Sequence, residues 1–349
     1  MHSFADDFLD RQPLPHDLVR SLTLIAEYKG KEELFRRQSP QVLETLRRSA
    51  VISSTESSNR IEGVVAERGR IEELVDQRSA PRTRSEQEIA GYREVLDTVH
   101  ASHAAMEPTP NLVLQLHRDL FQYTARPGGR WKSVDNLITE TGADGQPRLR
   151  FQPVSALETP AAMEALHRRF ARAWEEGRVD RPLLIGAYVF DFLCVHPFLD
   201  GNGRMARLLT LLLLYQAGFT VGRYISLERV VERSRESYYG TLGASTRGWH
   251  DGEHTLLPWW EYFLGVLTAA YRDFEDRVGD TGAPRGSKRQ MVRAAIRRMA
   301  REFRYADVAA ECPGVSRPTI ARAMGELRDA GEIRCLGTGR GASWEKLEP

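Results

Sequence analysis

Apolar residues recur at helical spacing along most of the chain before residue 280. Spacings of three and four residues give a helix one continuous apolar face. The segments that follow this pattern are 34–50, 85–100, 163–176, 182–195, 203–217 and 258–278. Ser85 with Glu88 predicts a capping box at one helix start, and Gly177 and Gly218 predict helix ends. The pattern therefore predicts a mainly α fold.

The stretch 131–151 departs from this pattern. Two short runs with apolar residues stand on either side of the Gly-containing segment 141–145. Such runs around a tight turn are typical of a β-hairpin. We therefore expect a hairpin here, and the local sequence by itself favours a surface hairpin without a special role.

The last part of the chain has its own order of elements. An apolar stripe predicts a helix over 291–299, a short helix follows over 305–312, and a third begins after Ser316 as N-cap. Two strand-like runs then flank the Gly-rich segment 337–341. This order of helix, helix–turn–helix and hairpin predicts a small winged helix-turn-helix domain over 287–349.

Charge separates this tail from the rest of the chain. The 349 residues carry 49 Lys and Arg against 48 Asp and Glu, a net charge of +1. From Arg285 onward there are 14 basic and 8 acidic residues, so the tail has a net charge of +6 and residues 1–284 have −5. The segment 279–287 is rich in Gly, Pro and small polar residues, as linkers are. We place a domain boundary there.

Composition excludes several classes of protein. With 41% hydrophobic and 28% charged residues, the chain has the composition of an ordinary globular protein. Three widely separated cysteines disfavour a disulfide framework or a zinc ribbon and favour a reducing compartment. The start of the chain lacks the basic flank of a signal peptide, and the most apolar run, 208–214, is too short to span a membrane. We expect a cytoplasmic protein with no membrane partner.

The most informative stretch is 196–207, which lies between two apolar helices and reads His-Pro-Phe-Leu-Asp-Gly-Asn-Gly-Arg-Met-Ala-Arg. Gly201 and Gly203 allow backbone conformations in which successive N–H groups form an anion nest at a helix N-terminus. Asn202 adds a neutral donor. The turn is therefore suited to holding phosphate.

The charged residues of the same stretch extend this chemistry. Arg204 and Arg207 are three apart, so both can reach one side of the first helical turn and fork phosphate oxygens. Asp200 is a hard oxygen ligand suited to Mg²⁺, and His196 can accept a proton near neutral pH. Together these residues predict a site for in-line attack on a nucleotide phosphate.

The stretch 196–207 resembles the H-P-F-x-D-G-N-G-R-x-x-R signature of the Fic family at every defining position. The resemblance implies transfer of AMP from ATP to a Tyr, Thr or Ser hydroxyl of a target protein, with release of pyrophosphate. It implies that His196 is the general base and that Asp200 holds Mg²⁺. The residues that it assigns to the phosphates of ATP are Gly201, Asn202, Gly203, Arg204 and Arg207.

The resemblance also predicts how the chain before the tail is divided. It implies an N-terminal helical region over 1–110 and a Fic core over 111–279. Family members with Lys at the position of Gly203 are similar in fold but phosphorylate their targets. The glycine here implies nucleotidyl transfer.

A second motif, 57–63, resembles the S/T-x-x-x-E-G inhibitory helix that precedes many Fic cores. Ser58 and Glu62 are four residues apart and share one face of a helix, which we expect near 53–63. The resemblance implies that Glu62 pairs with Arg207 and keeps the γ-phosphate out of its productive position. The alternative is a solvated carboxylate at an ordinary helix end.

Two further groups of candidate binding residues are predicted only from their position relative to the motif 196–207. The 131–151 hairpin stands where the family has a flap that pairs with the target segment as an added strand. The candidate docking residues in and before it are Trp131, Val134, Leu137 and Ile138. Tyr238 and Tyr239 stand where family members shape the adenine pocket, and buried helix aromatics would give the same pattern.

Other functions stay open. The chain could be a transcriptional regulator whose body senses nucleotide and whose tail binds DNA through Arg317, Arg322 and Arg328, with Arg340 in the wing. Against this, Glu326 shares the predicted exposed face, and winged helices also bind proteins. Glu62 could instead orient a hydrolytic water, so that the enzyme mainly removes AMP. The resemblance further implies that self-modification and homodimer formation are common among such proteins.

Overall fold

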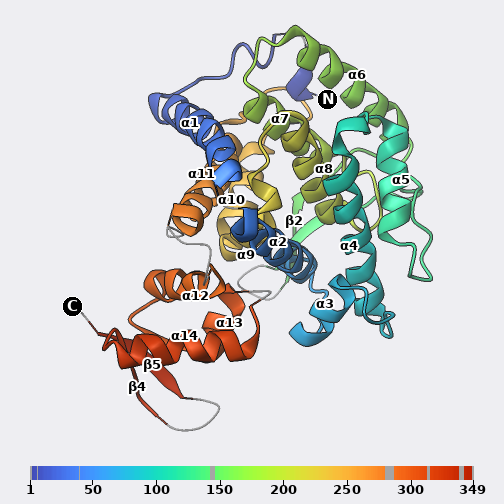
Figure 1. Cartoon of the computed structure of the whole chain (residues 1–349). Helices are drawn as coiled ribbons and strands as arrows, with labels where there is room; N and C mark the ends of the chain where they lie inside the picture. Colours follow the sequence, from blue (N-terminus) through green and yellow to red (C-terminus); the bar gives the residue numbers. More distant parts are fainter. Residues whose placement is uncertain are drawn as a thin grey trace.

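Helices dominate the computed structural model, which describes residues 2–5, 7–38, 40–141, 146–279, 287–312, 315–337 and 342–347 (Figure 1). The expected mainly α fold is confirmed. The elements of the body are η1 (His2–Phe4), α1 (His16–Gln38), α2 (Pro40–Ile61), α3 (Arg68–Val75), α4 (Arg84–Ser102), η2 (His103–Ala105), α5 (Pro110–Leu120), β1 (Ile138–Thr141), β2 (Pro147–Phe151), α6 (Thr159–Glu176), α7 (Arg181–Val195), α8 (Asn202–Gln216), η3 (Val221–Arg223), α9 (Leu227–Arg233), α10 (Arg235–Ser245) and α11 (Leu257–Gly279).

The consecutive helices α7 and α8 form the centre of the body. Every residue of α7 is buried except Arg181 and Leu193. Helices α6 and α11 pack on α7, while α4 and α5 pack on α8. A helix that is apolar all round must be covered on every side, so the loop between α7 and α8 is held in a fully packed frame. The predictions 182–195 and 203–217 are confirmed, with ends shifted by one residue.

The N-terminal helices differ from their prediction. A single helix over 34–50 was expected, but α1 ends before this range does and α2 continues to Ile61. The apolar pattern missed this part of α2 because residues 53–59 are polar and yet buried, whereas the helix expected near 53–63 from the second motif is present as far as Ile61. Some of the side chains of 53–59 find buried partners, as Ser54 Oγ does by donating to Glu228 Oε2 at 2.7 Å, whereas Thr55 Oγ1 and Ser57 Oγ have no hydrogen-bond partner among the described residues. Small hydroxyl residues also let the helix approach its neighbours closely.

The predicted capping box at Ser85 was also wrong. The N-cap of helix α4 is Thr83, two residues before the predicted Ser85. The Thr83 side chain accepts from the Glu86 backbone N–H at 3.2 Å. Glu88 is buried rather than folded back on the helix start, and it forms an ion pair with Arg204. Tertiary pairing therefore outweighs the local cap.

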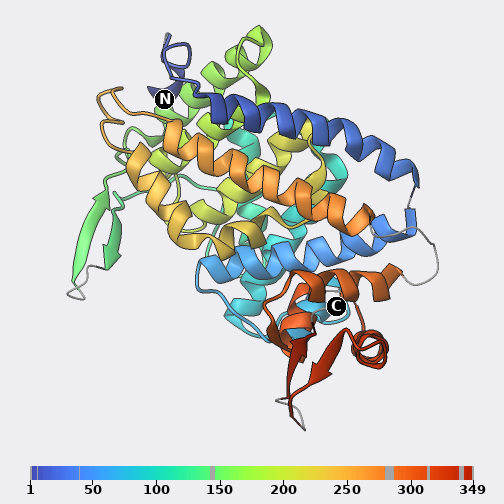
Figure 2. The ribbon, with the colours of Figure 1, turned by 90° about the vertical axis from the view of Figure 1, so that its left-hand side faces the viewer.

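The predicted hairpin is confirmed over a shorter range. Strands β1 and β2 are antiparallel, with Thr139 opposite Leu149 and Glu140 opposite Arg148. The turn residues 142–145 lie outside the described residues. Figure 2 shows the hairpin projecting from the body. In this two-stranded sheet each strand has an outer edge whose backbone groups can pair with a further strand.

A smaller C-terminal unit follows α11. Its elements are α12 (Ser287–Arg298), β3 (Glu302–Arg304), α13 (Tyr305–Glu311), α14 (Arg317–Asp329), β4 (Ile333–Cys335) and β5 (Ser343–Lys346). The strands form an antiparallel sheet in the order β3-β5-β4. Strand β3 was not predicted, because three residues give no alternation to detect. The linker residues 280–286 and the turns 313–314 and 338–341, with Arg340, lie outside the described parts of the chain.

This unit rests against the helical body (Figure 1). Helix α12 contacts α2 and α11. From α13, Glu311 accepts from Arg229 Nη2 at 3.3 Å and forms a second ion pair with Arg233, both on α9. A charged seam of three side chains thus joins the two parts.

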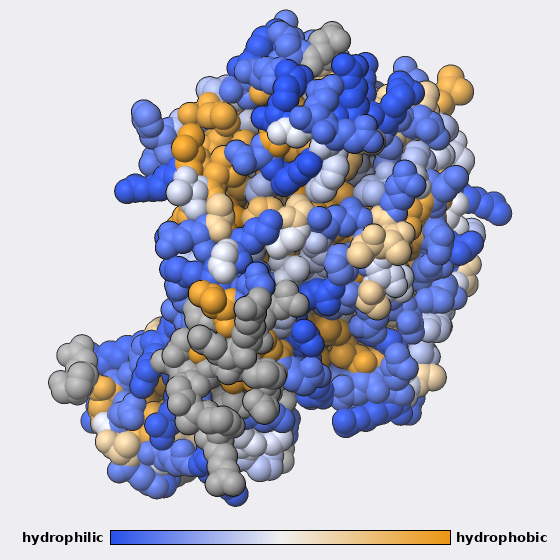
Figure 3. Space-filling view, turned by 45° about the horizontal axis from the view of Figure 1, so that its top comes forward, coloured by the Kyte–Doolittle hydropathy of each residue, from blue (hydrophilic) through white to orange (hydrophobic). Residues whose placement is uncertain are grey.

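One face of the molecule is mostly polar. Figure 3 shows a face on which hydrophilic residues predominate and apolar residues form separate patches. Among the residues that the structure describes, no helix has both the length and the apolar character needed to cross a bilayer.

Candidate active site

The turn between α7 and α8 is shaped by two left-handed residues. His196 ends α7 with φ 51° and ψ 59°, and Gly201 precedes α8 with φ 83°. Asn202 closes the turn, since its Oδ1 accepts from the Phe198 N–H at 2.9 Å and its Nδ2 donates to the Phe198 carbonyl at 2.7 Å. The side chain of Asn202 therefore holds the loop with one of its two Nδ2 hydrogens, and its role as a phosphate donor stays a prediction.

A cavity of about 580 Å³ opens beside this turn. The predicted site residues among its walls are Glu62, Leu137, Ile138, His196, Asp200, Gly201, Asn202, Gly203, Arg207, Tyr238 and Tyr239. The walls that were not predicted are Thr139, Arg150, Phe151, Leu193, Cys194, Leu199, Arg235, Leu242, Gly243 and Thr246. Four residues predicted for the body's site that do not line it are Ser58, Trp131, Val134 and Arg204.

His196 presents one ring nitrogen to the cavity. Its Nδ1 lies 3.3 Å from the Leu193 carbonyl, which can only accept, so Nδ1 carries the proton and Nε2 keeps its lone pair. Burial lowers the pKa of the imidazole from 6.5 to about 4, and the charge of Lys132 acts in the same direction. At neutral pH the ring is therefore uncharged and able to accept a proton.

The start of α8 supplies donors for an anion. The first N–H groups of a helix have no carbonyl four residues earlier to bind. Gly201, Asn202 and Gly203 line the cavity at this point. The Gly201 N–H already donates to Asp200 Oδ1 at 2.7 Å, so the amides that follow it face the cavity at the positive end of the helix dipole.

Arg207 is held through Nε and Nη2 at the C-terminal end of α2. Its Nε donates to Ser58 Oγ at 2.8 Å, and its Nη2 donates to the Ser58 carbonyl at 2.9 Å and to Glu62 Oε1 at 2.7 Å. Burial disfavours the guanidinium charge, yet the charge of Glu62 and nearby tyrosines keep the Arg207 pKa above its usual value. A Cβ on Gly203 would overlap Glu62 Oε1, so Glu62 occupies the space beside the turn.

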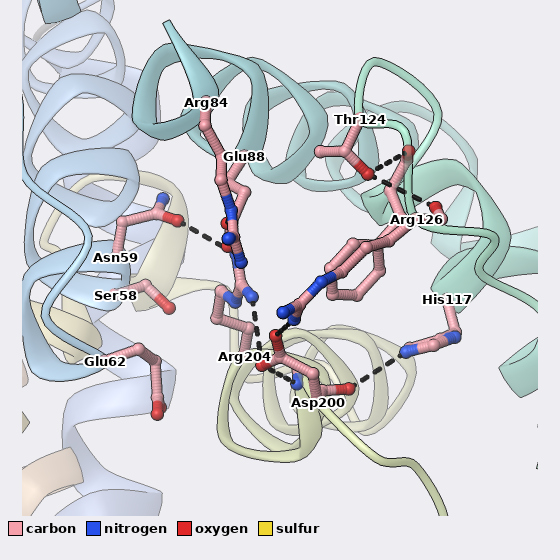
Figure 4. Close-up of polar contacts among 12 residues, drawn as sticks. Ser58, Asn59, Glu62, Arg84, Glu88, His117, Thr124, Arg126, Asp200 and Arg204 are labelled. Carbon is pink, nitrogen blue, oxygen red and sulfur yellow. Dashed lines mark hydrogen bonds and ion pairs between the residues drawn. The ribbon is translucent and has the colours of Figure 1, made fainter. Parts of the chain in front are cut away.

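Arg204 is buried and pairs with a carboxylate of α4. It is 1% exposed, its Nη1 lies 2.8 Å from Glu88 Oε2 of α4, and Asn59 Oδ1 is 3.5 Å away (Figure 4). The guanidinium also lies 5.2 Å from the centre of the Phe121 ring. The buried carboxylate of Glu88 turns Arg204 toward α4, and its phosphate contact stays a prediction.

Asp200 is the one predicted metal ligand. Its Oδ2 accepts from Arg126 Nη1 at 2.7 Å, as Figure 4 shows, and its side chain is 44% exposed. Within the described ranges no three His, Cys, Asp or Glu side chains gather into a metal cluster. A lone carboxylate fits Mg²⁺, because this ion keeps waters and binds substrate phosphates through the rest of its shell. Arg126 was not predicted and now holds that carboxylate.

The far end of the cavity is aromatic and basic. Tyr238 is 5% exposed and its ring centre lies 5.1 Å from that of Tyr239. Arg150 of β2 and Arg235 of α10 place their guanidinium groups 5.3 and 5.6 Å from the Tyr239 ring. Neither arginine was predicted, because each stands among ordinary surface charges in the sequence. An aromatic wall with planar cations beside it can stack a nucleobase.

The predicted docking residues divide into two groups. Leu137 and Ile138 line the cavity at the base of the hairpin, and Leu137 is 60% exposed. Val134 is exposed but outside the cavity, while Trp131 packs its ring 5.3 Å from that of Phe198 under the turn. Trp131 is thus part of the support of the loop.

Sequence reasoning missed His117 of α5, which supports the turn from outside. Its Nδ1 accepts from the Gly129 N–H at 2.9 Å, so Nε2 donates to the Asp200 carbonyl at 3.1 Å (Figure 4). The ring stacks on Phe198 with centres 3.6 Å apart. Burial lowers the pKa of His117 to about 4. No local signal marks this residue, since its partners lie 12 and 83 positions away.

The two predicted arginines of the C-terminal unit lie far from this cavity in the fold. Arg317 and Arg322 are exposed on α14, which contacts α12, α13 and β4. Glu326, expected to share their face, instead pairs with Arg289 at 2.6 Å and Arg293 at 3.4 Å, both on α12.

Comparisons with known proteins agree on the fold. A Fic family protein from Desulfovibrio desulfuricans G20 matches with 21% identity and a TM-score of 0.62, over 97% of this chain and 98% of that one. A Fic domain-containing signalling protein from Bacteroides thetaiotaomicron matches with 21% identity and a TM-score of 0.60, over 71% and 95%. Fic-1 from C. elegans matches with 18% identity and a TM-score of 0.58, over 73% and 72%.

The sequence comparison concerns the segment that holds the turn. Residues 107–214 match the Fic/DOC family, and this range contains His117, Asp200 and Arg207. Glu62 and α10 lie outside it. The similarity to the Fic/DOC family therefore covers the segment 107–214, which contains the turn.

Proposed function

We propose that the protein is an adenylyltransferase that moves AMP from ATP to a hydroxyl side chain of a protein. The observation that carries this proposal is one cavity that combines the free Nε2 of His196, the amide end of α8 and the guanidinium of Arg207. Proton acceptance and phosphate positioning are the two things that attack on a nucleotide phosphate requires.

The proposed reaction balances in one displacement. The target hydroxyl oxygen attacks the α-phosphorus and forms a new P–O bond. The bond from that phosphorus to the bridging oxygen breaks, and its electron pair leaves on pyrophosphate. His196 Nε2 takes the hydroxyl proton. The amides of Asn202 and Gly203, beside Gly201, would hold phosphate oxygens, and Mg²⁺ at Asp200 would neutralise part of the phosphate charge.

Glu62 supports a built-in restraint on this reaction. Its carboxylate accepts from Nη2 of Arg207, the arginine whose guanidinium a γ-phosphate would also need. One guanidinium cannot serve both anions in the same geometry. We propose that Glu62 therefore holds ATP in an unproductive pose until it is displaced.

The remaining substrate contacts are proposals from the same cavity. The adenine ring would stack near Tyr238 and Tyr239, and the target segment would add a strand to the hairpin beside Leu137 and Ile138. The target is a protein with a Tyr, Thr or Ser hydroxyl, and a second copy of this chain is one candidate. We propose a cytoplasmic location.

The position of the label in ATP tests the reaction class. The Glu62→Gly chain is incubated with Mg²⁺ and ATP carrying label at either the α- or the γ-phosphate, with and without a bacterial lysate. We expect protein-bound label from α-labelled ATP and none from γ-labelled ATP. Transfer of the γ-label would make the protein a kinase, and no transfer of either label would contradict the proposal.

DNA binding by the C-terminal unit is the second candidate function. The order α12-β3-α13-α14-β4-β5 with a three-stranded sheet supports a winged helix-turn-helix. The specific observation in its favour is that Glu326 turns toward α12 and leaves Arg317 and Arg322 on the exposed face of α14.

Retention of a duplex by the whole protein tests this candidate. We expect binding at low salt that falls steeply as salt rises and is weakened by Arg317→Ala with Arg322→Ala. Arg20→Ala is the matched control, because Arg20 is an exposed arginine on α1, outside the C-terminal unit. No retention of any duplex would leave protein–protein contact as the better account of this unit.

A further inference from the structure

Four consecutive carbonyls at the end of α7 are held by one short segment of chain. Lys132 Nζ donates to the Val195 carbonyl at 3.1 Å, and the Lys132 backbone N–H donates to the Pro197 carbonyl at 2.8 Å. Asn136 Nδ2 lies 3.4 Å from the His196 carbonyl and 3.0 Å from the Phe198 carbonyl. Carbonyls at a helix end have no partner within the helix, so this segment supplies them.

The side chains of Lys132 and Asn136, which together we call the clamp, are bonded to each other. Lys132 Nζ also donates to Asn136 Oδ1 at 2.8 Å. Lys132 is 3% exposed, which is rare for a lysine without a carboxylate partner. Its charge sits at the negative end of the α7 dipole, where a cation is stabilised. Burial nevertheless lowers the Lys132 pKa to about 8.

The clamp encloses a strained residue. His196 and Gln77 are the non-glycine residues with positive φ in the described part of the chain. A left-handed conformation costs a residue with a Cβ on the order of 1–3 kcal/mol and persists only where its surroundings enforce it. Since the carbonyls on both sides of His196 are fixed from Lys132 and Asn136, the clamp supplies that enforcement.

We propose that Lys132, acting with Asn136, is a positioning residue that holds His196 in its left-handed turn with Nε2 directed into the cavity. For its chemical consequence this inference rests on the proposed function. Lys132 stands six residues before Ile138, where the hairpin begins, so the same segment that carries the docking strand also sets the base.

Charge gives the clamp a second effect. The charged groups that act on His196 are Lys132, which favours the neutral ring, and Glu62, which favours the protonated ring. Asp135 faces Lys132 from the same segment. Removal of Lys132 leaves Glu62 unopposed, so the pKa of His196 should rise toward 6.5.

The test uses Lys132→Met, Lys132→Arg and Asn136→Ala in the full chain. The first readout is the His196 imidazole signal in an NMR pH titration, which needs no catalytic activity. The second is kcat for AMP transfer, with KM for ATP, across pH 5–8 in the Glu62→Gly background. Lys29→Met is the matched control, because Lys29 Nζ caps the end of α8 at the Ala217 carbonyl (2.8 Å) away from the cavity.

We expect Lys132→Met to raise the His196 pKa and to lower kcat at least tenfold with little change in KM. In the Glu62→Gly background the rate should fall as pH drops through the raised pKa. Lys132→Arg should restore part of kcat. Asn136→Ala, at a half-buried position, should show a smaller loss of kcat, and Lys29→Met should show neither effect.

A folded Lys132→Met chain with an unchanged His196 titration and unchanged kcat would overturn the proposal. If Lys132→Met does not fold, the proposal is tested on Asn136→Ala, and an unchanged kcat of that variant would overturn it. If no variant and no parent transfers AMP, the proposed function fails, while the NMR titration still reports on the clamp.

Discussion

The chemistry of single residues in the cavity depends on which atom of each side chain is already bound within the protein. His196 uses Nδ1 on the Leu193 carbonyl and keeps Nε2 for a substrate. Asn202 uses both ends of its amide on Phe198, and Arg204 is held by Glu88. The residue type tells which bonds a side chain can form, and its partners within the protein determine which of its atoms are left for a ligand.

His196→Ala should fold normally and bind ATP but lose transfer. The imidazole accepts the target's proton and holds no phosphate, and loss of a general base costs about 10²–10⁴-fold in rate. Rate is measured by AMP labelling, and binding by calorimetry. His16→Ala, an exposed histidine at the start of α1, is the control. Undiminished labelling by His196→Ala would remove this residue from the catalytic role.

Arg204→Met should act on stability first. Arg204 and Glu88 are 1% and 7% exposed on their side chains, and removal of one member of a buried pair leaves the other charge uncompensated. We expect the free energy of unfolding to fall by about 3–5 kcal/mol, and the double variant Glu88→Met/Arg204→Met to recover much of it. Urea unfolding measures both. A stable Arg204→Met chain with weakened ATP binding would instead support the phosphate contact predicted from sequence.

The two arginines show what the sequence could predict. The motif correctly places both in the first turns of α8, and Arg207 reaches Glu62 as expected. Their different directions depend on Glu88 and Glu62, which belong to other helices. A three-residue spacing leaves roughly 60° between side chains, and only the tertiary partners resolve that angle. For the same reason His117, Arg126 and Lys132 could not be found from local sequence.

At the scale of elements, prediction succeeded where burial is apolar and failed where it is polar. Apolar residues at helical spacing predicted helices α6, α7, α8 and α11. The polar stretch of α2 gave no such signal, although it carries Ser58. The hydroxyls of Ser54 and Ser58 bond to groups on other elements, which no local pattern records.

The N-terminal element η1 is an anchor for α7. The Ser3 N–H and Oγ donate to Asp191 at 3.2 and 2.7 Å, and both residues are 0% exposed. Ser3→Ala should lower the free energy of unfolding by about 1–3 kcal/mol, because a buried carboxylate loses a donor. Ser21→Ala, which removes an exposed hydroxyl bond within α1, should change it by less than about 0.5 kcal/mol. Equal stability of the two variants in urea would contradict the anchor.

At the scale of the whole molecule, α9 joins the C-terminal unit to the helix that carries Ser58. Arg229 and Arg233 bind Glu311 of α13, while Glu228 and Glu232 of the same helix bind Ser54 and Arg60 of α2. A seven-residue helix therefore has one face toward each part.

Glu311→Ala should loosen the seam between the parts. We expect faster amide hydrogen exchange in α12 and α13, since the arginines of α9 lose their acceptor. Glu302→Ala, at an exposed position of β3, is the control. Unchanged exchange in Glu311→Ala would mean that the contacts of α12 with α2 and α11 hold the unit by themselves.

The central claim is that the cavity transfers AMP and that Glu62 restrains it. The most direct measurement is self-modification with labelled ATP and Mg²⁺, comparing the parent chain with Glu62→Gly and Glu62→Gly/Arg207→Ala. Glu67→Gly, at the N-cap of α3 where glycine is tolerated, is the control. The account predicts increased labelling for Glu62→Gly alone, because the double variant also lacks the phosphate clamp. Labelling of Glu62→Gly equal to or below that of the parent would contradict it.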